Sequence, residues 1–193
     1  MKCICVFCGS GAGNRPEYVA SARGLAALLQ SRGWGLVYGG GRVGMMGALA
    51  DAALAAGVQT VGVIPQALVE REVAHTGLTE LRVVSSMHDR KALMADLADG
   101  FVALPGGLGT LDEFFEICTW AQLGIHAKPC GLVNVAGYFD PLLAVLDRAV
   151  EEGFLNETHR SIVMVESSAE ALLMRFDRFR PKRISKYADR WDR

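Results

Sequence analysis

Short apolar runs alternate with helix-length amphipathic segments along this chain, and this alternation constrains the fold more than any other feature. Short apolar runs bounded by glycine or polar residues are typical of buried strands. Strands separated by helices form βαβ units, in which the strands are parallel and helices cover the sheet. The sequence therefore predicts an α/β fold with a central parallel sheet of about seven strands. The expected strands are 3–8, 35–38, 60–64, 81–84, 100–104, 129–133 and 162–165, and the expected helices are 16–31, 43–56, 88–98, 111–123, 139–152 and 169–179.

Length and composition favour one domain that acts on small molecules. The chain has 193 residues, of which 51% are hydrophobic. This is enough for one substantial hydrophobic core, and the chain is short for two. A formal net charge of −1 gives no reason to expect a nucleic-acid binder. We expect a single domain over residues 1–180, followed by a solvated basic tail over residues 181–193. Contact of this tail with nucleic acid or a partner is the alternative interpretation.

Cysteine usage and the lack of long apolar runs predict a cytoplasmic protein. Five cysteines, an odd number, lie mostly inside apolar runs, as expected of reduced thiols. Cys5 and Cys8 have the spacing of half a redox or zinc site. No second pair and no suitable histidine spacing accompany them, so we interpret them as buried strand residues and expect no metal. No apolar run approaches the roughly 20 residues of a membrane span, and the N-terminal apolar run is too short for a signal peptide.

A glycine-rich loop, residues 105–110, lies where a predicted strand ends and a helix begins. Its glycines let the backbone approach a ligand closely, and free N–H groups at a helix N-terminus favour a phosphate. Glu113 follows one turn inside the helix, where a carboxylate suits general-base or electrostatic work on the ligand. The alternative is structural, because Thr110-x-x-Glu113 also fits a capping box, which satisfies N–H groups at a helix start.

Two further glycine loops, residues 8–13 and 39–47, follow predicted strands. The second has the G-x-G-x-x-G spacing between a strand and a helix. The next strand ends at Pro65 without the acidic residue that holds the ribose of NAD, so we expect contact with a nucleotide or sugar phosphate but not NAD. Tight helix packing through Gly44 and Gly47 is the alternative. No Walker-type lysine follows any of the loops, and we expect them to form a ligand crevice at the carboxyl ends of the strands.

Several charged side chains are further candidates for ligand contact. Arg90 and Lys91 lie at the start of a predicted helix, where a guanidinium group suits phosphate binding or stabilisation of a departing base. A solvated helix face is the alternative for both. Glu72 follows the third predicted strand and is an ordinary surface residue unless its loop reaches the ligand. Glu116 lies one turn after Glu113 and offers a second carboxylate on the same helix face.

Together these segments resemble the LOG (Lonely Guy) family of cytokinin riboside 5′-monophosphate phosphoribohydrolases. The resemblance rests on Pro105-Gly106-Gly107-x-Gly109-Thr110-x-x-Glu113, on Met87-His88-x-Arg90-Lys91 before it and on residues 119–126 after it. Residues 5–10 and 38–41 are similar to the family as well. The match spans about residues 3–180. This chain has Asp112 where the family often has glutamate, and Leu108 where the family's bulky residue varies.

The resemblance implies a Rossmann-like homodimer that hydrolyses the N-glycosidic bond of a purine nucleoside 5′-monophosphate without a cofactor. The products are the free base and ribose 5-phosphate, and plain and N6-prenylated adenine both stay open as the base. It further implies that Arg90 and Glu113 are the catalytic pair. With the other glycine loops included, the expected substrate-binding residues are Ser10, Gly40, Gly41, Glu72, Lys91, Gly106, Gly107, Leu108, Gly109, Thr110, Leu111, Asp112 and Thr119.

Two other functions compete with this one. A non-catalytic nucleotide-binding module would show affinity without turnover. A lysine decarboxylase, a label often given to such proteins, needs pyridoxal phosphate on a lysine, and only Lys91 lies near the expected site. No membrane or nucleic-acid partner is expected.

Overall fold

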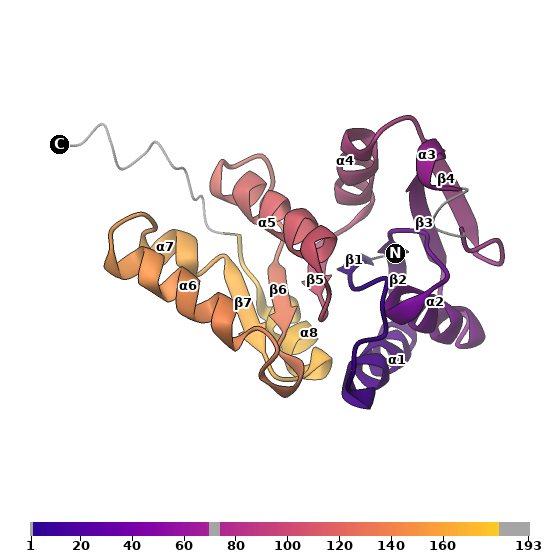
Figure 1. Ribbon diagram of the computed structural model, residues 1–193, viewed down its shortest axis with the longest axis horizontal. Helices are drawn as coiled ribbons and strands as arrows, with labels where there is room; N and C mark the ends of the chain where they lie inside the picture. The colour runs from indigo at the N-terminus through magenta and orange to yellow at the C-terminus, as the bar shows by residue number, and fades with distance from the viewer. Residues whose placement is uncertain (1, 70–73, 182–193) are drawn as a thin grey trace.

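A seven-stranded parallel sheet forms the centre of the molecule (Figure 1). The computed structural model describes residues 2–69 and 74–181. The strand order is β4-β3-β2-β1-β5-β6-β7, and each strand runs parallel to its neighbours. The expected α/β class and number of strands are confirmed. The strands are β1 (Cys3–Phe7), β2 (Gly35–Tyr38), β3 (Thr60–Pro65), β4 (Glu80–Val84), β5 (Gly100–Ala103), β6 (Cys130–Val133) and β7 (Val163–Glu166).

Five long helices lie between strands and a sixth follows the last strand, as the sequence predicts. Each of their ends lies within one residue of the expected position, except that α5 begins three residues early. Two single-turn helices and a 3₁₀ turn were not expected, because one turn is too short to show an apolar periodicity. The helices are α1 (Pro16–Ser31), α2 (Gly44–Ala55), α3 (Gln66–Val69), α4 (Met87–Leu97), α5 (Leu108–Gln122), η1 (Val135–Gly137), α6 (Asp140–Glu151), α7 (Glu157–Arg160) and α8 (Ala169–Arg178).

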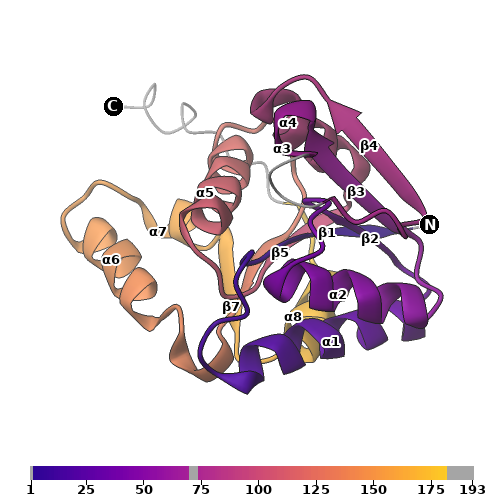
Figure 2. The ribbon, with the colours of Figure 1, turned by 45° about the vertical axis from the view of Figure 1, so that its right-hand side comes forward.

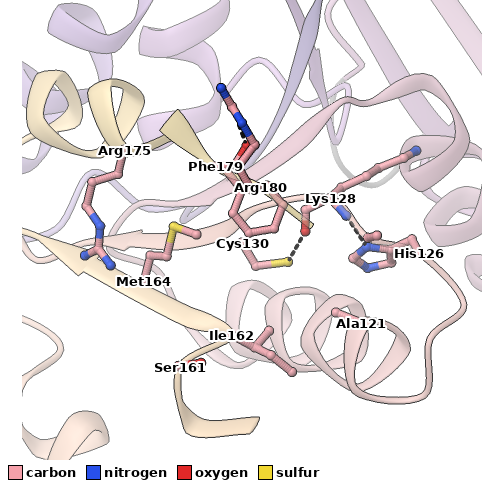
Figure 3. Close-up of a pocket in the computed structure, with 11 residues that line it drawn as sticks. Ala121, His126, Lys128, Cys130, Ser161, Ile162, Met164, Arg175, Phe179 and Arg180 are labelled. Carbon is pink, nitrogen blue, oxygen red and sulfur yellow. Dashed lines mark hydrogen bonds between the residues drawn. The ribbon is translucent and has the colours of Figure 1, made fainter. Parts of the chain in front are cut away.

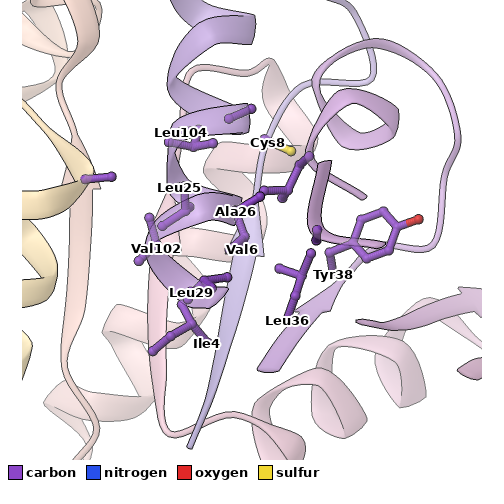
Figure 4. Close-up of a cluster of buried hydrophobic side chains, with 14 of the residues drawn as sticks. Ile4, Val6, Cys8, Leu25, Ala26, Leu29, Leu36, Tyr38, Val102 and Leu104 are labelled. Atoms are coloured by element: carbon purple, nitrogen blue, oxygen red, sulfur yellow. The ribbon is translucent and has the colours of Figure 1, made fainter. Parts of the chain in front are cut away.

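Helices cover both faces of the sheet and make three layers (Figure 2). On one face α1, α2 and α8 pack against the cluster that contains Ile4 and Val6 (Figure 4). On the other face α4, α5 and α6 pack against the cluster that contains Cys5 and Phe7. Successive residues of β1 enter opposite clusters because strand side chains alternate between the two faces. This two-sided burial explains why the strands are continuous apolar runs in the sequence.

The order in which strands add to the sheet reverses after β1, and two of the glycine loops meet at this point. β2, β3 and β4 extend the sheet on one side of β1, whereas β5, β6 and β7 extend it on the other. The loops after β1 and β5 therefore leave the same edge side by side, where open α/β sheets bind their ligands. The N–H of Gly9 donates to the carbonyl of Pro105 at 3.1 Å and joins the two loops.

All the described strands belong to one sheet, and the chain enters its last described segment after α8. Residues 182–193 of the expected basic tail lie outside the described residues, as does Glu72. None of the helices within residues 2–69 and 74–181 combines the length and the apolar character needed to cross a membrane. All five cysteines are free, and Cys5 and Cys8 are buried as expected.

Candidate active site

The glycine-rich loop runs directly into the first turn of α5. Gly107 is the N-cap residue, and no side chain caps the helix. Thr110 is therefore the third residue of the helix rather than its cap, so the capping-box interpretation of Thr110 and Glu113 is wrong. In the described part of the chain, no acceptor takes a hydrogen bond from the N–H of Leu108, Gly109 or Thr110. Such N–H groups at a helix N-terminus favour the binding of an anion.

Contacts on both sides hold this loop in place. Pro105 accepts a hydrogen bond from Gly9, and the carbonyl of Gly106 accepts one from the hydroxyl of Tyr138 at 2.6 Å. A Cβ on Gly106 would lie 2.1 Å from Oγ1 of Thr110 and 2.7 Å from the backbone nitrogen of Gly9. Only glycine therefore allows the loop after β5 to approach the loop after β1 this closely.

Arg90 is buried at the start of α4, where it is 6% exposed, so its interpretation as a solvated helix residue is wrong. The Ser86 hydroxyl caps this helix by accepting a hydrogen bond from the N–H of Asp89 at 3.0 Å. Nε of Arg90 donates to the carbonyl of Val63 and Nη2 to that of Gly39, both at 3.1 Å. A Cβ on Gly39 would lie 2.1 Å from Nη2. The guanidinium group is thus fixed at the carboxyl ends of β2 and β3, in space that glycine leaves open.

Glu113 forms an ion pair with Arg90, with 3.6 Å between Oε1 and Nη2. The side chains of Arg90 and Glu113 are 7% and 11% exposed, so water screens this pair less than a surface pair. Both line a cavity of about 190 Å³, together with Ser10 and the first turn of α5. The structure therefore brings the two expected catalytic residues together beside the N–H groups that favour an anion.

The thiols of two cysteines near this pair are unreactive. Burial, and secondarily the charge of Glu113, raises the pKa of the Cys8 thiol, which lines the same cavity. Burial and Glu113 likewise raise the pKa of Cys5, against an opposing effect of Arg90. Because the thiolate is the nucleophilic form, neither cysteine acts as a nucleophile at neutral pH.

Lys91 of α4 forms a second charged group with two carboxylates of α5. Its Nζ lies 2.8 Å from Oε2 of Glu116 and 3.2 Å from Oδ2 of Asp112. The nearby carboxylate of Glu116 is the main cause that raises the pKa of Lys91. Neither Lys91 nor Asp112 lines the cavity of Arg90 and Glu113.

The G-x-G-x-x-G segment serves close packing at the start of α2. The N–H of Met45 donates to the carbonyl groups of Gly9 at 3.1 Å and Gly11 at 3.3 Å. Gly44 has a φ of 59°, and a Cβ there would lie 2.1 Å from the carbonyl oxygen of Ser10. Carbonyl groups of the β1 loop thus occupy this helix terminus, which supports the packing interpretation for Gly44.

Some of the other expected contact residues line this cavity and others do not. Gly40 and Gly41 are buried and lie outside the cavity. Leu111 and Thr119 also lie outside it. Gly106 lines an adjacent cavity of about 300 Å³ that shares Gly107 with the first one. The expected residues that line the cavity itself are Ser10, Gly107, Leu108, Gly109, Thr110, Arg90 and Glu113.

Another cavity, of about 260 Å³, lies at the amino edge of the sheet, where Cys130 begins β6 (Figure 3). Two of its cations already have partners. Nζ of Lys128 donates to the carbonyl of Ala95 at 2.8 Å, and Arg175 pairs with Glu166 at 2.9 Å. None of the residues expected to bind substrate lines this cavity in the described part of the chain. The glycine loops therefore mark the better candidate for an active site.

Two residues that build the site were not expected from the sequence. Gly39 was assigned to a nucleotide-binding motif, whereas it makes room for Arg90. Tyr138 holds the carbonyl of Gly106, which lies 32 positions earlier in the chain. The motif that contains Gly39 gave no sign of its contact with Arg90, and no local pattern marks Tyr138.

Solved structures with a similar fold are distant in sequence. The molybdenum cofactor binding protein from Rippkaea orientalis has a TM-score of 0.69 and 23% identity, over 92% of this chain and 97% of that one. The molybdenum cofactor carrier protein from Chlamydomonas reinhardtii has a TM-score of 0.65 and 21% identity, over 90% and 94% of the two chains. At this level of identity the likeness shows the Rossmann-like fold alone.

Comparison of sequences shows the family. A family model described as "Possible lysine decarboxylase" matches residues 46–176. The Arabidopsis thaliana protein named cytokinin riboside 5′-monophosphate phosphoribohydrolase LOG1 is 49% identical over 181 residues, which are 94% of this chain and 85% of that protein. The Oryza sativa subsp. japonica protein LOG is 48% identical over 179 residues, 93% of this chain and 74% of that protein. Near half identity over almost the whole chain means that it belongs to the LOG family of cytokinin riboside 5′-monophosphate phosphoribohydrolases.

Proposed function

We propose that this chain hydrolyses the N-glycosidic bond of purine nucleoside 5′-monophosphates and releases the free base and ribose 5-phosphate. Its relatives in the LOG family carry the name of this reaction. The observation that carries the proposal is the buried ion pair of Arg90 and Glu113, 3.6 Å apart, in the cavity that the uncapped start of α5 also lines.

The start of α5 suits the 5′-phosphate of the substrate. Its free N–H groups and the helix dipole stabilise negative charge at this end. Glu113 follows Leu108 along the same helix at an axial distance of about 7.5 Å. A nucleotide bound by its phosphate at the first turn therefore places its ribose near Glu113. Binding of the phosphate then supplies energy and position for the reacting carbon.

The reaction needs a carboxylate beside the ribose. As the C1′–N9 bond breaks, positive charge develops on the ribose, and the carboxylate of Glu113 stabilises it and orients the attacking water. The water oxygen becomes the hydroxyl group on C1′, and its released proton replaces the ribose on the base. Arg90 cannot turn away, because two backbone carbonyls hold it. Its charge balances that of Glu113 and counters negative charge on the departing base.

A lysine decarboxylase fits the lysines of the described region poorly. A lysine that forms a Schiff base needs a lowered pKa, because the neutral amine is the nucleophile. The pKa of Lys91 is raised instead, chiefly by Glu116. Lys128 lies at the amino edge of the sheet and donates to the carbonyl of Ala95.

We further propose that the protein is a homodimer and acts in the cytoplasm. Leu123 and Ile125, at the end of α5, are 40% and 65% exposed, and they belong to the segment 119–126 that resembles the family. Twofold-symmetric dimers are the commonest oligomers. Five free cysteines suit a reducing compartment. Sedimentation at assay concentration tests the dimer, and an active monomer would contradict it.

Incubation with AMP, isopentenyl-AMP and adenosine tests the activity, with chromatographic separation of the bases. We expect both nucleotides to lose their base and adenosine to stay intact even near saturation, because it lacks the group that binds at α5. A protein that binds the nucleotides but releases no base would be the non-catalytic module. Equal rates on AMP and adenosine would mean that phosphate binding at the glycine loop does not contribute to the reaction.

A further inference from the structure

We infer that Tyr138 is a positioning residue, which sets the orientation of the Gly106–Gly107 peptide in the loop that begins α5. Tyr138 lies between η1 and α6, and its hydroxyl donates to the carbonyl of Gly106 at 2.6 Å. The inference rests on the proposed function, because it says how the phosphate site of that function is held in its binding form.

Peptide geometry links this hydrogen bond to the anion site. A trans peptide is planar, and its C=O and N–H groups point in opposite directions. Tyr138 lines one cavity and Glu113 lines an adjoining one, and Gly9, Ser10 and Gly107 line both. A Gly106 carbonyl directed toward Tyr138 therefore directs the N–H of Gly107 away from Tyr138, which leaves it available to a ligand in the cavity that Gly107 lines with Glu113.

The loop needs such a restraint because glycines flank this peptide. Glycine adopts positive and negative φ with similar ease, so sterics alone do not select one orientation of the peptide between Gly106 and Gly107. In the reversed orientation, a carbonyl oxygen would stand where the N–H of Gly107 now points, and it would repel a phosphate. The hydroxyl of Tyr138 selects the orientation that attracts one.

The turn before α6 holds the ring of Tyr138 in one place. Oδ1 of Asn134 accepts a hydrogen bond from the N–H of Phe139 at 2.7 Å. Ala136 has a φ of 51°, the one positive value at a non-glycine residue in the described chain, and such a conformation persists where the surroundings enforce it. The ring of Tyr138 packs edge-on against Tyr18 at 5.6 Å and Phe139 at 4.9 Å between centroids.

Tyr138→Phe tests this role, because it removes the hydroxyl and keeps the ring contacts. Titration calorimetry with ribose 5-phosphate should show a dissociation constant about three- to tenfold higher than that of the wild type, the effect of one lost hydrogen bond. KM for AMP should rise by a similar factor with a smaller change in kcat, because the remaining N–H groups at the start of α5 still position the bound phosphate. Ribose, which has no phosphate, provides the background titration.

Tyr18→Phe is the matched control, since the hydroxyl of Tyr18 has no hydrogen-bond partner in the described part of the chain. We expect it to bind ribose 5-phosphate more tightly than Tyr138→Phe does. An unchanged dissociation constant in Tyr138→Phe would overturn the inference, as would equal weakening in both variants. If wild-type protein released no base from AMP while the calorimetric difference held, the proposed reaction would fail and the positioning role would stand.

Discussion

Gly39→Ala tests whether the backbone of β2 and β3 holds Arg90 as the structure describes. The added methyl group would lie 2.1 Å from Nη2 of Arg90, whereas nonbonded heavy atoms pack at about 3.5–4.0 Å. The guanidinium group must therefore move. The move breaks its hydrogen bond to the carbonyl of Gly39 and disturbs the one to Val63. Because Arg90 is 6% exposed, water does not readily replace these carbonyls.

The structure sets the size of the expected loss. A hydrogen bond from a charged group contributes about 1.5–3 kcal/mol, and overpacking of a buried site costs about 1–3 kcal/mol. The two costs do not add in full, because the move that breaks the hydrogen bond also relieves the overpacking. We therefore expect the free energy of unfolding to fall by about 2–4 kcal/mol. For a chain of this length, that lowers the melting temperature by roughly 4–16 °C. Since Arg90 faces Glu113, kcat for AMP should also fall about tenfold or more at temperatures where the variant is folded.

Gly24→Ala is the control for the loss of a glycine. Gly24 lies within α1, and nothing lies within 4 Å of a Cβ built there. Alanine should stabilise this helix by about 0.5–1 kcal/mol and leave kcat unchanged. Melting followed by circular dichroism and base release followed by chromatography give the two measurements. A Gly39→Ala protein with the melting temperature and kcat of the wild type would refute the account of Arg90.

Three further results are expected. Glu113→Gln should lose about a hundredfold or more in kcat and also melt at a lower temperature, because it removes the charge that balances buried Arg90, and a variant that keeps its rate would give Glu113 a structural role alone. Iodoacetamide at neutral pH should leave Cys5 and Cys8 unmodified in the native protein and alkylate both after denaturation, as mass spectrometry would show; alkylation in the native state would contradict their burial. AMP hydrolysis should persist in excess chelator, since no group of three metal-ligating side chains occurs in residues 2–69 and 74–181; loss of activity restored by a metal ion would contradict this.

Periodicity predicted the layers of this fold because burial on both faces of the sheet leaves a direct trace in the sequence. The start of α5 was misplaced for a physical reason. Gly107 and Gly109 are poor helix formers, so the sequence indicated a loop through Thr110, whereas the helix already begins at Leu108. Propensity alone is a weak guide where the surrounding structure holds the first turn.

The site was predicted to the extent that its residues lie in local motifs. The loop before α5 and the charged start of α4 both carry recognisable patterns, and their ion pair confirms that they meet. Two contacts between distant segments were not predicted. Gly39 meets Arg90 across 51 positions, and Tyr138 meets Gly106 across 32, so neither leaves a periodic or spaced signal.

The position of β1 inside the sheet affects how the chain folds during its synthesis on the ribosome. Strands β1 to β4 pair with one another in the order of their synthesis, so this half can assemble before the rest of the chain emerges. β5 then adds to the edge of β1 that the first half leaves open. Arg90 belongs to the half made first and Glu113 to the half made second. A stalled nascent chain thus carries Arg90 without Glu113, and an open apolar strand edge, which is a template for aggregation. The ion pair of Arg90 and Glu113 forms when β5 and the helix after it join the first half.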